Sequence, residues 1–187
     1  MGIARRYSGA KYSSVAARYA RRKVQGKKMA EGGKERLHRL RRLYIEHPIF
    51  FVTMRIHDQR CRLDASTMHE ALREFGAVGL ERGCYLGRYV LMPDHVHLFV
   101  KFQPTAEGSL VTLSRWVSAL KNVCSMVWRA QGLAAPHWQK GFFDHVLRSS
   151  ESYGEKWRYV EQNPVRAGLV ARCADWPYQG EIYRLEY

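Results

Sequence analysis

Acidic residues are few in this chain, and the signatures of several protein classes are missing. The 187 residues include 17 Asp and Glu against 31 Lys and Arg. No apolar stretch approaches the roughly 18 residues that a membrane-spanning helix needs, and no apolar segment follows the basic N-terminus as in a secretory signal. No Gly-x-x-x-x-Gly-Lys-[Ser/Thr] loop is present to bind nucleotide phosphates. We therefore expect a cytoplasmic protein that does not interact with membranes.

The cysteines are also few and carry no recognisable pattern. Cys61, Cys84, Cys124 and Cys173 are scattered, and no two of them form a Cys-x-x-Cys pair. A chain of this size has enough residues to build a core without disulfides. The spacing therefore favours buried, reduced thiols.

Positive charge is concentrated in the first quarter of the chain. Residues 1–47 hold 14 Lys and Arg against 3 Glu, whereas the remaining 140 residues hold 17 Lys and Arg against 14 acidic residues. This division predicts a partly flexible basic arm, residues 1–47, attached to a nearly neutral domain, residues 48–187. Such an arm attracts polyanions, of which nucleic acid is the commonest inside cells, although a solvated tail that only aids solubility is the alternative. The cations expected to contact DNA are Arg5, Arg6, Arg18, Arg21, Arg22, Lys23, Arg39, Arg41 and Arg42.

The domain shows alternating strand and helix patterns. Apolar and β-branched runs predict strands, and apolar residues at helical spacing predict helices. The expected strands are 49–56, 85–92, 95–102 and 141–147, and the expected helices are 68–80, 109–130 and 150–163, the last ended by Pro164. This order matches a ferredoxin-like α+β sandwich, an antiparallel sheet with helices packed on it.

The segment Met92–Val100 places two histidines at alternate positions of an expected strand, after a Pro-Asp turn signal. Alternate side chains of a strand point to the same face. His95 and His97 would therefore share a face, close enough to bind one metal ion. A half-exposed strand face without a metal explains the same alternation.

A second candidate element lies in the last expected helix. Tyr159 and Asn163 are four residues apart and therefore share a helix face. A tyrosine hydroxyl can act as a covalent nucleophile, and an amide oxygen can bind a hard metal ion. Considered alone, the same pair also fits a surface tyrosine and the end of a helix before proline.

Three blocks, in this order, resemble the REP-associated tyrosine transposases, a bacterial branch of the single-tyrosine HUH transposases. The blocks are Met92–Val100, Trp138–Arg148 and Tyr159–Val170, and the resemblance covers about residues 45–180. It implies the HUH endonuclease fold, with His95, His97 and Asn163 as metal ligands and Tyr159 as nucleophile. The arm lies outside these blocks, so its role is inferred from charge alone.

The resemblance also implies the reaction. The enzyme would cleave and rejoin single-stranded DNA bearing REP-like hairpins through a 5′-phosphotyrosine intermediate, as a monomer or homodimer. Nitrogen and oxygen ligands without thiolates suit Mg²⁺ or Mn²⁺. Two alternatives remain: a non-catalytic regulator that binds DNA hairpins, and a metal phosphoesterase with water as its nucleophile. The sequence assigns no general base, since His145 and Glu161 are equally compatible with supporting or surface positions.

Overall fold

The computed structural model describes residues 47–57 and 65–187. The nine cations expected to contact DNA lie outside the described residues, as does Cys61. The proposed boundary between arm and domain at residues 47 and 48 therefore stays a prediction.

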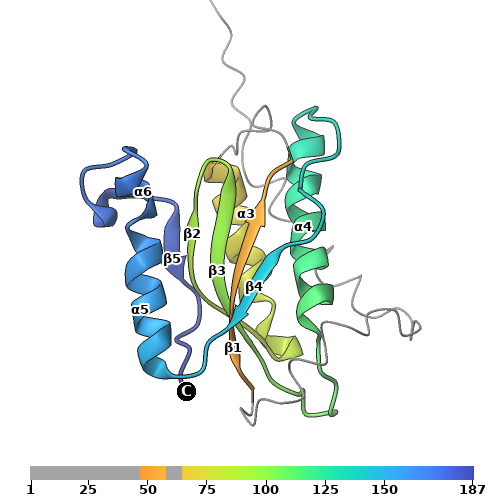
Figure 1. The fold of residues 1–187 in the computed structure, drawn as a ribbon. Coiled ribbons are helices and arrows are strands. Elements are labelled where there is room, and N and C mark those ends of the chain that lie inside the picture. Colours follow the sequence, from red (N-terminus) through yellow and green to blue (C-terminus); the bar gives the residue numbers. More distant parts are fainter. Residues whose placement is uncertain (1–46, 58–64) are drawn as a thin grey trace, which may run out of the picture.

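The core of the fold is one antiparallel sheet of five strands in the order β4-β1-β3-β2-β5 (Figure 1). Each pair of neighbouring strands runs antiparallel. The strands are β1 (Ile49–Arg55), β2 (Cys84–Leu91), β3 (His95–Phe102), β4 (Phe143–Val146) and β5 (Gln179–Glu181). The first four have the order of a ferredoxin-like sheet, which confirms the predicted fold class. The sequence patterns did not predict β5.

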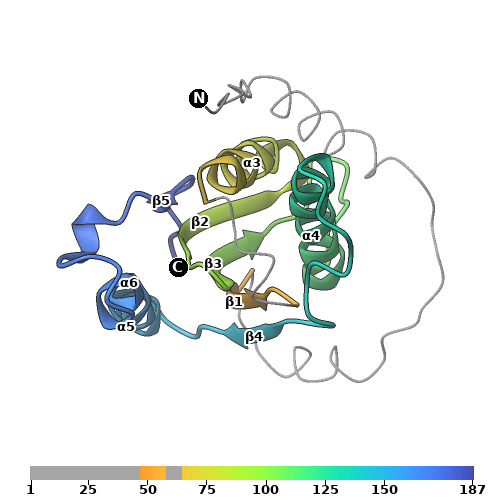
Figure 2. The same ribbon diagram turned by 90° about the horizontal axis from the view of Figure 1, so that it is seen from above.

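Two helices cover one face of this sheet, as the view along the strands shows (Figure 2). They are α3 (Ala65–Ala77) and α4 (Leu113–Ala130), and a short 3-10 helix, η1 (Leu80–Arg82), follows α3. The Thr112 side chain caps α4 by accepting a hydrogen bond from the backbone N–H of Arg115. The predicted helix start at Ser109 was therefore wrong, because the chain becomes helical only after this cap. Leu110, which lies in the predicted helix range 109–130 but before the cap, is exposed.

The β2–β3 hairpin fixes which side chains of β3 face the helices. The backbone N–H of Met92 donates to the carbonyl of His95 and closes the turn at 2.8 Å. Val96 and Leu98 then point into the core beneath α3 and α4. His95 and His97 therefore point to the opposite face, as the alternation predicted.

The opposite face is covered by the C-terminal part of the chain. A capping box between Ser149 and Ser152 begins α5 (Ser150–Glu161), and α6 (Asn163–Arg166) follows it almost directly. Tyr153 and Val160 of α5 pack with Phe99 of β3 in a second apolar cluster. A second 3-10 helix, η2 (Cys173–Asp175), then leads to β5.

The predicted end of the last helix was wrong. α5 ends at Glu161, and Pro164 lies in the first turn of α6 instead of terminating a helix that reaches Asn163. Proline is tolerated there because the first N–H groups of a helix have no partner within it. Tyr159 and Asn163 therefore lie on two consecutive helices.

Two further expectations from the sequence concern the cysteines and the helices. Cys84 and Cys124 are buried free thiols, as predicted, whereas the free thiol of Cys173 is only half-buried. Within residues 47–57 and 65–187, no helix has the length and apolar character needed to cross a membrane.

Candidate active site

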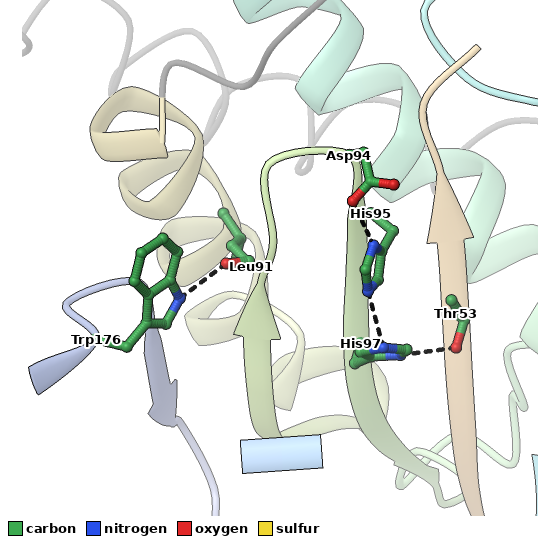
Figure 3. Close-up of polar contacts among 6 residues, drawn as sticks. All are labelled: Thr53, Leu91, Asp94, His95, His97 and Trp176. Atoms are coloured by element: carbon green, nitrogen blue, oxygen red, sulfur yellow. Dashed lines mark hydrogen bonds and ion pairs between the residues drawn. The ribbon is translucent and has the colours of Figure 1, made fainter. Parts of the chain in front are cut away.

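His95 and His97 form the centre of the candidate site. Both rings lie on the face of β3 opposite α3 and α4, and both are half-buried. Their Nε2 atoms are 3.0 Å apart, and the rings meet nearly edge to face (Figure 3). The structure therefore brings the two predicted metal ligands together at the atoms that would bind a metal.

A hydrogen bond at Nδ1, the ring nitrogen that does not face the other histidine, orients each imidazole. Nδ1 of His95 lies 2.6 Å from Oδ1 of Asp94, and Nδ1 of His97 lies 2.8 Å from the hydroxyl of Thr53 on β1 (Figure 3). An ionised carboxylate can only accept, so the Nδ1–H of His95 donates to Asp94. This leaves the Nε2 lone pair of His95 directed at His97. Such outer partners fix the tautomer and the ring orientation of metal-binding histidines.

The surroundings of His97 keep its ring neutral. Burial is the main cause that lowers the pKa of His97 to about 3, and the charges of His95, Arg55 and Arg166 lower it further. Phe51 stacks on the ring with a centroid distance of 5.4 Å. A neutral imidazole is the form that binds a metal ion.

The paired nitrogens fit a divalent ion. Neighbouring ligand atoms around an octahedral ion, with bonds of about 2.1 Å, lie about 3.0 Å apart. The two Nε2 atoms already have this separation. Among the described residues, no group of three or more His, Cys, Asp or Glu side chains could hold a metal ion. Within the described part of the chain, a third protein ligand would therefore be of another type, such as an amide.

Tyr159 and Asn163 are brought together by Arg166. The Arg166 guanidinium donates to the carbonyl of Tyr159 at 2.6 Å and to the amide oxygen of Asn163. It also lies over the Tyr159 ring, 4.2 Å from the ring centroid. The Tyr159 side chain is 64% exposed, so a substrate can reach its hydroxyl.

These two groups of residues lie at the same end of the domain. α6 is near the end of the sheet where β2 turns into β3 (Figure 1). The positive charge of Arg166 is close enough to His97 to help lower its pKa. Metal binding by Asn163 and nucleophilic attack by Tyr159 stay predictions, as does metal binding by the histidines.

Sequence reasoning missed three residues of this site. Asp94 was interpreted only as part of a turn, although a carboxylate directly before a histidine is a candidate outer partner. Arg166 follows Asn163 by three residues, a spacing that brings side chains together in a helix. Thr53 precedes His97 by 44 residues, and only the β1–β3 register pairs them. No local signal in the sequence identifies Thr53.

Comparisons with known proteins are consistent with this geometry. The family model described as "Transposase IS200 like" matches residues 7–163, which is well over half of the chain and includes most of the basic arm. A REP-associated tyrosine transposase of Escherichia coli strain K12 is 29% identical over 139 residues, covering 74% of this chain and 79% of the relative. A solved structure of a REP-associated tyrosine transposase bound to a REP hairpin superimposes with a TM-score of 0.57 at 25% identity. That match covers 81% of this chain and 82% of the solved one.

Proposed function

The chain belongs to the IS200-like transposase family, and on this premise we propose a specific reaction for it. It cleaves and rejoins single-stranded DNA that carries a hairpin, with a divalent metal ion, through a 5′-phosphotyrosine intermediate. The observation that carries this proposal is the pair of Nε2 atoms 3.0 Å apart, each ring held by an outer partner. A half-exposed strand face without a function would not need both rings oriented in this way.

The residues divide into binding and reacting groups. His95, His97 and Asn163 would hold the metal, with Asp94 and Thr53 orienting the two imidazoles. When bound, Mg²⁺ or Mn²⁺ supplies Lewis-acid polarisation of the scissile phosphate. Nitrogen ligands make Mn²⁺ the easier fit of the two. Attack by the Tyr159 hydroxyl is supported by the packing of α5 on the same face of the sheet as the histidines.

The covalent step conserves the energy of the DNA backbone. The Tyr159 oxygen forms a bond to phosphorus while the bond from phosphorus to the 3′ oxygen breaks. The hydroxyl proton of tyrosine passes to solvent, and the departing 3′ oxygen takes up a proton. Because one phosphodiester replaces another, a different 3′-hydroxyl can reverse the step and join strands without ATP. The exposed position of Tyr159 gives solvent direct access to this proton.

Arg166 fits a role in stabilising charge on the phosphate. Its guanidinium lies between the Tyr159 ring and the Asn163 amide, so it would face a phosphate attacked by Tyr159. We expect Arg166→Ala to lower the rate of cleavage about a hundredfold, a typical cost of removing one preorganised donor. Rates measured at saturating DNA and Mn²⁺ check this. An unchanged rate would show that the guanidinium only joins α6 to the Tyr159 carbonyl of α5. Arg172→Ala, which removes another exposed arginine, is the matched control.

The DNA partner is proposed from the relative and from charge. The solved relative is bound to a REP hairpin, and this chain has a formal net charge of +14. We therefore propose that a DNA hairpin of this kind is the element recognised. The catalytic unit would lie within one subunit, because α5 packs on the sheet of its own chain, whether the protein is a monomer or a homodimer.

Deleting residues 1–44 should weaken DNA binding and flatten its dependence on salt. The slope of log K against log salt for single strands scales as about −0.7 per neutralised phosphate, so lost cations reduce the slope. Cleavage at saturating DNA should survive, since His95, His97, Tyr159 and Asn163 all lie beyond the deletion. Binding titrations at four salt concentrations measure this effect. A slope equal to that of the full chain would mean that the arm makes no phosphate contacts.

A further inference from the structure

Phe143 on the edge strand β4 is exposed in an unusual place. Its side chain is 60% exposed, although β4 is part of the sheet and pairs with β1. We propose that Phe143 is a stacking platform for a DNA base that flanks the scissile phosphate, and thereby positions the single strand in the site. This inference rests on the proposed function and adds a substrate-binding residue to it.

The strand register places Phe143 beside the histidines. Phe143 is opposite Thr53 in the β1–β4 pair, and Thr53 is opposite His97 in the β1–β3 pair. The three residues therefore form one row across the sheet. The hydrogen bond between Thr53 and His97 shows that the row points to the face of the candidate site. Two strand spacings, about 10 Å, separate the backbones at Phe143 and His97.

Aromatic rings in contact connect Phe143 to His97. The Phe143 ring meets the edge of Phe51 at a centroid distance of 6.4 Å, and Phe51 in turn stacks on His97. Phe51 is buried beside the row, on the same face of β1 as Thr53, whereas the Phe143 ring is exposed to solvent. A ligand seated on Phe143 would be next to a phosphate held at the histidines.

Positive charge surrounds the same surface. The Lys156 ammonium of α5 lies over the Phe51 ring, 5.3 Å from its centroid. Arg55, at the end of β1, is exposed, is paired in register with His95 and contributes to lowering the pKa of His97. An apolar ring bordered by cations suits a nucleotide, which has a flat base beside an anionic phosphate. A protein partner would need a larger apolar patch than this one ring.

The test uses the full chain and a hairpin oligonucleotide with 2-aminopurine placed, in turn, at each position flanking the cleavage site. Stacking quenches the emission of 2-aminopurine, so this readout reports contact without requiring cleavage. We expect one position to be quenched on binding, and Phe143→Leu to abolish that quenching. Phe143→Tyr should preserve the quenching, because it retains the aromatic face while leucine retains only apolar bulk.

Binding and cleavage measure the cost of losing the platform. Stacking one base on an aromatic side chain typically accounts for on the order of tenfold in affinity. Phe143→Leu should therefore weaken binding of the flanked hairpin about tenfold and leave binding of the hairpin without its flank unchanged. An abasic nucleotide at the quenched position should cause the same loss in the wild type and no further loss in Phe143→Leu. Leu110→Ala, another exposed apolar side chain, located before α4, is the matched control.

Failure of this inference can be told apart from failure of the proposed reaction. Equal quenching in wild type and Phe143→Leu, or equal affinity for the flanked hairpin, would refute the platform even if the wild type forms a covalent adduct. Quenching at Phe143 without any adduct from the wild type would retain the platform and refute the covalent reaction. If Phe143→Leu instead alters the oligomeric state without affecting DNA, the ring is a contact between copies, and the inference is wrong.

Discussion

Replacing His97 by alanine should lower metal-dependent cleavage by more than about a hundredfold while the domain stays folded. Loss of an outer partner of a metal ligand costs about 10–100-fold, so loss of the ligand itself should cost more. His95→Ala should have the same effect. Cleavage assays across a range of Mn²⁺ concentrations check both variants, with circular dichroism to verify the fold. Cleavage at the wild-type rate by both variants would show that the metal site is wrongly assigned.

Variants of other residues at the proposed metal site, with smaller expected effects on metal binding, provide the control for this prediction. Thr53→Val keeps the shape of the side chain but removes the hydrogen bond to Nδ1 of His97. It should weaken apparent Mn²⁺ affinity by about 10–100-fold while saturating metal restores most of the rate. Asn163→Ala should also weaken metal affinity, though less than either histidine variant, because water can replace a neutral amide oxygen. Equal losses in all four variants would point to a folding defect instead of graded metal binding.

Tyr159→Phe should form no covalent adduct with DNA and should lose strand cleavage altogether. The change removes one oxygen atom from a side chain that is 64% exposed, so packing is nearly unaffected. The lost activity would therefore reflect chemistry and not stability. Incubation with labelled hairpin DNA and Mn²⁺, followed by a denaturing gel, detects the adduct as a shifted band.

Tyr153→Phe is the matched control, because Tyr153 lies on the same helix but faces the core. Its ring packs against Phe99 at a centroid distance of 5.0 Å, and burial raises the pKa of Tyr153 to about 12. A buried, protonated hydroxyl is a poor nucleophile. Tyr153→Phe should therefore form the adduct normally. An adduct lost in this variant and kept in Tyr159→Phe would reverse the assignment of the nucleophile.

Most strands of the sheet could be predicted from local sequence patterns, namely alternating apolar residues and turn signals. Alternation placed His95 and His97 on one face of β3, and the Pro-Asp turn signal before them separated the expected strands 85–92 and 95–102. β5 was missed because it has only three residues, Gln179–Glu181, and no alternating apolar pattern. The strand forms because β2 offers an edge for it to pair with. Such pairing depends on residues about 90 positions away in the chain.

The site was predictable where its chemistry is local and not where it depends on tertiary contacts. The two histidines lie on one strand, so their spacing alone predicted that they converge. Thr53 joins them only through strand register, and Phe143 joins the same row through a second pairing. The position of Asn163 was harder to predict, because proline begins a new helix after α5 and Arg166 then binds the amide.

The proposed mechanism is tested most directly by the end at which DNA becomes attached to the wild-type protein. Hairpin-bearing single strands, labelled at the 5′ end or the 3′ end, are incubated with the full chain and Mn²⁺ and separated on a denaturing gel. A 5′-phosphotyrosine retains the downstream fragment, so we expect a shifted band only with the 3′ label. A shifted band with the 5′ label would contradict the polarity of attack. Clean cleavage without any shifted band would contradict the covalent mechanism and favour water as the nucleophile.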